Sequence, residues 1–228
     1  MRTIIGVCGI VTLCAGTAAC QTEGDRVPDS QGQKQYFPTQ EEAVRKARAD
    51  LVSVLQSRAD VQLGVDANAV QQAQAGVPVR RVDVDFARLL TADTAATFGQ
   101  LIAAERTTVV PLVAGGRVVT IVEIAQEQPG WRVVGLAGND IAQDLTAVLA
   151  AAGDTAAATV VLYEVPNLQL RVYGVTRGGT ETLFTDYKSR FTLRQGVPAR
   201  ALLPVLRADA VEFQRVYGDS ARAGRLLR

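Results

Sequence analysis

Two carboxylates in the first half of the chain have the spacing of an acid–base pair. Asp83 and Asp85 are separated by one residue within residues 77–86, a segment that alternates apolar and charged side chains as a half-buried strand does. On one strand face they would lie roughly 6–7 Å apart, a spacing compatible with a catalytic carboxylate pair. Three arginines lie nearby in sequence: Arg80, Arg81 and Arg88. A charge-balanced, solvated strand face is therefore the simpler interpretation.

Other catalytic machinery is thinly represented. The 228 residues include no histidine, which removes the most common general base and metal ligand and excludes Ser-His and Cys-His catalysis. Asn139, Asp140 and Asp144 surround an expected helix start, where acidic residues complement the helix dipole. Lys188 and Ser189 are adjacent in an expected strand and would point to opposite faces, which argues against a Ser/Lys dyad. The sequence predicts no catalytic residue, no metal site and no cofactor.

Aromatic side chains are the remaining candidates for a binding surface. Trp131 begins an expected strand, and Tyr163 and Tyr173 lie on two strands joined by a turn. Core packing, or a stacked cross-strand pair of the two tyrosines, is the simpler alternative to an exposed patch for a peptide or glycan. We take Trp131, Tyr163 and Tyr173 as the candidate binding residues.

The first 20 residues indicate export. Arg2 precedes an apolar run, residues 4–13, that is too short to span a bilayer comfortably and is typical of a secretory signal peptide. All three cysteines, Cys8, Cys14 and Cys20, fall in this segment. The rest of the chain therefore cannot form an internal disulfide.

Thr17-Ala18-Ala19-Cys20 resembles the lipobox of bacterial lipoproteins, in which small residues precede a cysteine that is lipidated and becomes the new N-terminus. The alternative is an ordinary signal peptide cleaved after Ala19, which would leave Cys20 as a free thiol. The resemblance implies that acyl chains such as palmitate anchor Cys20 to a membrane of the cell envelope. Gln21, rather than Asp, after the cysteine implies the outer membrane if the host has one.

The chain divides into a signal peptide, a tether, a domain and a tail. These are expected at residues 1–19 (signal peptide), 20–38 (lipidated N-terminus and flexible tether), 39–218 (domain) and 219–228 (C-terminal tail). The tether is polar and rich in Gln, Gly and Pro. A capping-box pattern at Thr39 and an apolar periodicity predict an amphipathic helix over residues 40–57.

Hairpin-linked strands dominate the rest of the domain. Residues 107–153 and 158–217 both have the pattern of three strands followed by a helix, which is a duplication or a chance recurrence. A helical stretch is expected over 89–102, and the last strand over 181–193. Because the strands follow one another through hairpins, the sequence predicts an α+β fold. Its antiparallel sheet packs against an N-terminal helix and one or two further helices.

The order of these elements loosely resembles the cystatin-like folds. A helix precedes a meander of long hairpins, with Gly130-Trp131 opening a late strand, and the similarity covers residues 39–195. These folds include nuclear-transport-factor-like domains and the small inhibitory domains of secreted bacterial peptidases. The cystatin Gln-x-Val-x-Gly loop is not found, so no functional residue is carried over. The resemblance implies a curved sheet that can form a ligand pocket.

The charge balance bears on the class of partner. Lys and Arg number 24 against 23 Asp and Glu, and cleavage before Cys20 removes only Arg2, leaving 23 of each. A nucleic-acid-binding protein would carry a basic excess, so no nucleic-acid partner is expected. The expected function is that of a membrane-anchored envelope lipoprotein whose non-catalytic domain binds a protein or cell-wall partner. The alternatives are a small-ligand carrier and a carboxylate-dependent hydrolase of envelope material.

Overall fold

The computed structural model describes residues 34–57, 63–93, 95–153 and 158–222. The helices are α1 (Gln40–Ser57), α2 (Ala67–Gln72), α3 (Phe86–Thr91), α4 (Asn139–Ala152) and α5 (Ala199–Arg222). The strands are β1 (Gln74–Ala75), β2 (Val79–Val84), β3 (Ile102–Ala114), β4 (Arg117–Glu127), β5 (Gly130–Leu136), β6 (Thr159–Val165), β7 (Leu170–Arg177) and β8 (Thr180–Phe184). The predicted signal peptide, Cys20 and most of the tether lie outside the described residues.

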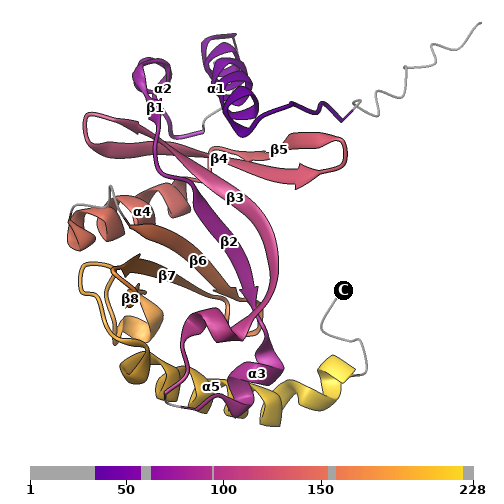
Figure 1. The fold of residues 1–228 in the computed structure, drawn as a ribbon, viewed down its shortest axis with the longest axis vertical. Helices are drawn as coiled ribbons and strands as arrows, with labels where there is room; N and C mark the ends of the chain where they lie inside the picture. Colours follow the sequence, from indigo (N-terminus) through magenta and orange to yellow (C-terminus); the bar gives the residue numbers. More distant parts are fainter. Residues whose placement is uncertain (1–33, 58–62, 94, 154–157, 223–228) are drawn as a thin grey trace, which may run out of the picture. The chain divides into compact units, whose positions relative to one another are not determined.

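Eight strands of the described chain form one twisted sheet (Figure 1). The strand order is β5-β4-β3-β2-β6-β7-β8, and the short β1 pairs with β3. Every neighbouring pair is antiparallel except β2 and β6, which run parallel. The predicted α+β class is confirmed. The expectation of a wholly antiparallel sheet is wrong at this one pairing, because the chain returns through α4 to the far side of β2.

Two three-strand meanders flank β2. One meander is β3-β4-β5 and leads into α4, and the other is β6-β7-β8 and leads into α5. Both contain a Gly-Gly hairpin turn whose residues have positive φ, 58° and 76° at Gly115-Gly116 and 52° and 80° at Gly178-Gly179. Two consecutive positive φ angles match the twist of the flanking strands and favour glycine. The three-strands-then-helix order is present in both halves.

The two faces of the sheet are covered by different helices. On the face that we call the α4 face, α4 packs against apolar residues of β2, β3, β4, β6 and β7, and Figure 1 shows it between β4 and β6. On the opposite, outer face, α1 covers one half of the sheet, and α3 and α5 cover the other. β6 is therefore apolar on both sides, with Leu162 on the α4 face and Val161 and Tyr163 on the outer face.

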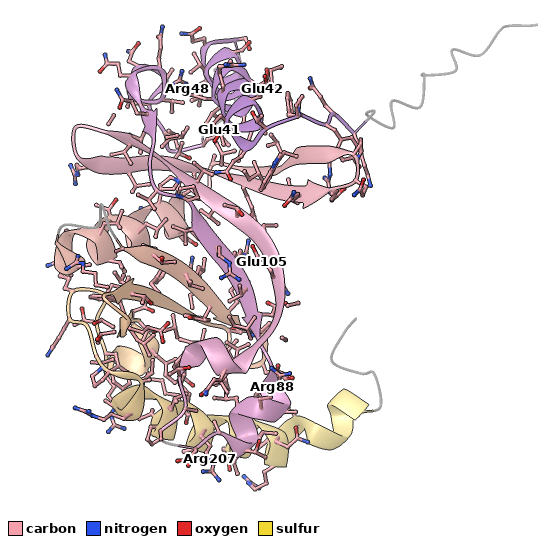
Figure 2. All side chains as sticks on the ribbon, in the orientation of Figure 1. Glu41, Glu42, Arg48, Arg88, Glu105 and Arg207 are labelled. Carbon is pink, nitrogen blue, oxygen red and sulfur yellow. The ribbon has the colours of Figure 1, made fainter. Side chains whose placement is uncertain are left out.

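Several arginines hold the helices and turns together through backbone carbonyls. Arg48 of α1 donates to the carbonyl oxygen of Ala73, just after α2, at 2.6 Å. Arg207 of α5 donates to the carbonyl oxygens of Leu90 and Ala92 at the end of α3, at 3.2 and 3.3 Å. Figure 2 labels both arginines, which lie at opposite ends of the domain. Such bonds satisfy carbonyls that a helix end leaves unpaired.

The segment that enters the domain is fixed to the sheet edge. Phe37 forms two backbone hydrogen bonds with Trp131 of β5, of 2.7 and 2.8 Å, and the Tyr36 hydroxyl donates to Glu127 at 3.1 Å. Gly130 permits this approach, because a Cβ at that position would lie 2.5 Å from the carbonyl oxygen of Phe37. The entering chain therefore covers part of the exposed edge of β5.

Two predicted elements differ from the structure. The helix expected over 89–102 is wrong, since α3 ends at Thr91, a short 3₁₀ turn follows, and β3 begins at Ile102. The strand expected over 181–193 ends at Phe184, where β8 is paired with Tyr173 of β7. The predicted boundaries of the N-terminal helix, residues 40–57, are confirmed by α1.

Candidate functional site

A cluster of charged side chains continues the α4 face beyond its apolar residues. Alternation along a strand places residues i and i+2 on one face, so Arg81 follows Val79, Glu123 follows Ile121, and Glu164 follows Leu162. We call the following five residues the charge cluster: Arg81, Asp83, Arg106, Glu123 and Glu164. They come from β4, β3, β2 and β6, which are neighbours in that order in the sheet.

Arg81 is the centre of the charge cluster. Its guanidinium donates to Glu123 Oε1 at 2.7 Å and to Glu164 Oε1 at 2.8 Å, and the three side chains are only 15–20% exposed. Arg106 donates to Asp83 Oδ2 at 2.6 Å and lies 3.5 Å from Glu164. Arg81, on β2, thus joins a carboxylate of β4 to a carboxylate of β6, the strands on either side of the β3–β2 pair.

Opposing effects act on the Arg81 guanidinium. Burial lowers the pKa of Arg81, but the hydrogen bonds and negative charges of Glu164 and Glu123 raise it further, so that its net pKa lies above the ordinary value. The cation is therefore permanently charged. A fixed cation paired with carboxylates of two different strands holds those strands together. Its Nε has no hydrogen-bond partner but is buried, so it is not presented to a substrate.

The predicted carboxylate pair is divided between two structural roles. Asp83 lies on β2 and pairs with Arg106, whereas Asp85 lies beyond the strand and is the N-cap of α3. The Asp85 carboxylate accepts hydrogen bonds from the backbone N–H groups of Ala87 and Arg88, at 2.9 and 3.1 Å. The strand face shared by the two aspartates is therefore a wrong expectation, because β2 ends at Val84.

Tyr173 is buried on the α4 face. It is 0% exposed, and its hydroxyl donates to Asp144 Oδ2 of α4 at 2.8 Å, while Arg171 lies 3.4 Å from the same carboxylate. Burial raises the pKa of Asp144, against the lowering effects of Tyr173 and Arg171. Burial, together with the charge of Asp144, raises the pKa of the Tyr173 hydroxyl far above its ordinary value. Asp144 therefore anchors α4 to β7 and does not cap the helix.

Tyr163 is buried on the opposite face. It is 3% exposed, packs against Phe98 with ring centroids 5.3 Å apart, and donates to Glu181 at 2.7 Å. The sheet separates it from Tyr173, so the two rings do not stack. The prediction of an exposed aromatic surface is wrong for these two tyrosines, because both rings are buried in the hydrophobic core. Trp131 is partly buried against α1 and pairs with Phe37.

The Lys188-Ser189 dipeptide lies in a tight turn and not in a strand. Both residues have positive φ, 51° and 54°, and the Lys188 ammonium pairs with Asp209 of α5 at 2.6 Å. Asp209 also contributes to the environment of Tyr187, where burial first, and then the hydrogen bond with Asp209, raise the tyrosine pKa to about 12. This group fixes the turn to α5.

An apolar groove lies at the other end of the α4 face, between α4 and the β3–β4 hairpin. Its volume is about 550 Å³. We call it the α4 groove, and its apolar lining includes Val77, Val79, Pro111, Val113, Val118 and Leu149. Val79 and Val160 form a buried floor, each 1% exposed, whereas Val77 at the rim is 42% exposed. Such a volume and lining are typical of sites for small ligands.

Polar groups at the α4 groove are few. The Thr146 hydroxyl donates to the carbonyl oxygen of Ala142 at 2.9 Å and accepts from the Val118 N–H at 3.3 Å, so it is already occupied. Arg117, the first residue of β4, lines the groove and also a wider groove of about 830 Å³ that runs along the exposed side of α4 past Arg194. Among the described residues, no hydrogen bond or ion pair engages the Arg117 guanidinium.

No protein-family model, no curated protein and no solved structure matches this chain. The resemblance to cystatin-like folds therefore stays a prediction. Within the described ranges, no three acidic or cysteine side chains are grouped to hold a metal ion. The helices of that same part include none long and apolar enough to cross a membrane.

The sequence drew attention to Asp83 but not to its surroundings. Glu123 and Glu164 lie 42 and 83 residues from Arg81, and only the sheet order brings them together. The α4 groove had one visible signal, a cation directly after the Gly115-Gly116 turn. A cation in that position indicates the end of a hairpin and not a ligand site, so the groove could be recognised only from the structure.

Proposed function

We propose that this protein is a lipid-anchored lipoprotein of the cell envelope whose domain binds a ligand or partner without catalysis. The observation that carries the proposal is the lipobox-like sequence ending at Cys20, preceded by Arg2 and a short apolar run. Acyl chains on Cys20 would anchor the mature protein, at the outer membrane if the host has one. The partners are then the membrane, through the lipid, and a protein or cell-wall component or small ligand, through the domain.

The geometry of the domain supports binding more than chemistry. In the charge cluster, the carboxylates of Asp83, Glu123 and Glu164 each accept a hydrogen bond from an arginine. Asp85 caps a helix, so the hydrolase alternative loses its carboxylate pair. The α4 groove, in contrast, is open and apolar, and the Arg117 cation beside it is paired with no described residue, which favours a binding domain or a small-ligand carrier.

The anchor is tested by the Cys20→Ser variant expressed in the cells of a bacterium. We expect the unaltered chain to sediment with membranes and to incorporate labelled palmitate, and the variant to lose both properties. Cys8→Ser and Cys14→Ser are matched controls that should behave like the unaltered chain, since both cysteines would be removed with the signal peptide. Membrane sedimentation and labelling that persist in Cys20→Ser would refute the anchor.

A further inference from the structure

The floor of the α4 groove restricts what can occupy it. β2 is paired on both sides, with β3 and β6, and β3 is paired with β1 and β2 on one side and β4 on the other. An extended peptide would therefore find its own N–H and C=O groups facing apolar side chains, which is costly for unpaired polar groups. A hydrocarbon chain has no such groups and gains from the burial of apolar surface. The floor favours an aliphatic chain.

The rim of the groove restricts the other end of the ligand. Arg117 lies where the α4 groove meets the wider groove along α4, and Arg194 lines that wider groove. Among the residues that the structure describes, no acidic side chain lines either groove. Elsewhere in the described chain, arginines such as Arg81 and Arg106 are engaged by carboxylates. An unpaired guanidinium presents the same planar donors to a carboxylate supplied from outside.

We propose that the α4 groove binds a single-chain fatty acid, with the aliphatic chain on the floor and the carboxylate paired with Arg117. This proposal rests on the proposed function, since it names the ligand of the binding domain. Two observations carry it together: an apolar volume of about 550 Å³ and one unpaired cation at its rim.

The test uses the full chain with the Cys20→Ser substitution. Because this variant lacks the proposed lipid, it is handled without detergent, which would compete for the groove. Calorimetric titration compares dodecanoate with dodecyltrimethylammonium, which has the same chain and the opposite charge. We expect one dodecanoate to bind per chain and the cationic amphiphile to bind at least about tenfold more weakly.

Two variants separate the head from the chain of the ligand. Arg117→Glu should weaken dodecanoate binding by roughly 10- to 100-fold, the effect of a lost charge-assisted pair. Ala150→Trp places a large ring in the groove from an exposed position on α4 and should abolish binding. The matched controls are Arg200→Glu and Ala201→Trp, exposed positions of α5 outside the groove, which should bind as the parent does. Equal unfolding midpoints of all four variants establish that they are folded.

Several results would overturn the proposal. Equal affinity for the two amphiphiles, or dodecanoate binding that survives Ala150→Trp, would place the ligand elsewhere. Binding of a short apolar peptide in the absence of dodecanoate binding would reject the ligand class. In each case the membrane sedimentation of the unaltered chain still reports on the anchor, so failure of this proposal is distinguishable from failure of the proposed function.

Discussion

The two ends of the α4 face are built from the same four strands yet differ in chemistry. At one end Arg81 pairs with Glu123 and Glu164 at 2.7 and 2.8 Å, and at the other Arg117 lies beside an apolar groove, where no described residue pairs with it. A paired, half-buried arginine satisfies neighbouring carboxylates and stabilises the sheet. An unpaired arginine beside apolar surface adds nothing of that kind to the fold, and it is free to bind.

The largest expected effect comes from breaking the paired end. Arg81→Ala leaves the half-buried Glu123 without its arginine and Glu164 with only Arg106, 3.5 Å away, and we expect a loss of about 2–4 kcal/mol in the free energy of unfolding. Urea denaturation measures it. Arg80→Ala is the matched control, because Arg80 is the preceding residue on β2 and pairs with Glu105, shown in Figure 2 beside β3, with both side chains about half exposed. It should cost less than about 1 kcal/mol. Equal losses would contradict the contrast between the two pairs.

Tyr173→Phe tests the hydrogen bond that joins β7 to α4. The substitution keeps the buried ring and removes the donor to Asp144, so we expect a loss of about 1–2 kcal/mol in the free energy of unfolding. Thermal denaturation is the measurement. A loss no larger than that of an exposed substitution would show that Asp144 finds another donor.

Asp144 also predicts a pH dependence with a definite sign. Its pKa is raised in the folded state, chiefly by burial, so the folded protein binds more protons than the unfolded chain just above the ordinary pKa of Asp. Stability from this group therefore falls as pH rises through that window. Asp144→Asn removes this titration. The free energy of unfolding of the variant minus that of the parent should therefore be larger at about pH 7 than at about pH 3. Denaturation at both pH values checks this, and a difference that shrinks or reverses with rising pH would refute it.

The smallest effect is expected at the groove end. Thr146→Val keeps the shape of the side chain but removes the acceptor of the Val118 N–H and the donor to Ala142, at a cost of up to about 1 kcal/mol. Thr91→Val is the control, because the Thr91 hydroxyl bonds only to carbonyls of its own exposed helical turn. A loss at Thr146 as large as that of Arg81→Ala would show that the groove wall is essential to the fold.

Local features of the fold could be predicted from the sequence. The residues of α1 were predicted because capping and apolar periodicity act within a few residues, and Thr39 indeed accepts the Glu42 N–H at 3.2 Å. The two Gly-Gly turns are local in the same sense, since two consecutive positive φ angles favour glycine.

Features that depend on pairing between distant parts of the chain could not be predicted from the sequence. The parallel β2–β6 pair joins residues about 80 positions apart, and nothing in either strand records its partner. The alternation of apolar and polar residues over 181–193 continues beyond Phe184, but β8 ends there. The next residue, Thr185, donates its hydroxyl to the carbonyl oxygen of Arg171, and the chain turns toward α5. The candidate site has the same character, because Arg81 and Arg117 both lie on strands, and only their neighbours in space distinguish the ion-paired arginine from the one that lines the groove.

The bridge between Phe37 and Trp131 determines how the domain would respond to mechanical load. A pull transmitted through the chain before Lys34 reaches two backbone hydrogen bonds and the Tyr36–Glu127 bond before it reaches α1. We expect these bonds to break first, so that a short segment separates from the edge of β5 while α1 remains packed on the sheet. Under the proposed lipid anchor at Cys20, a load from the membrane would therefore act first on these three hydrogen bonds and only later on the core of the domain.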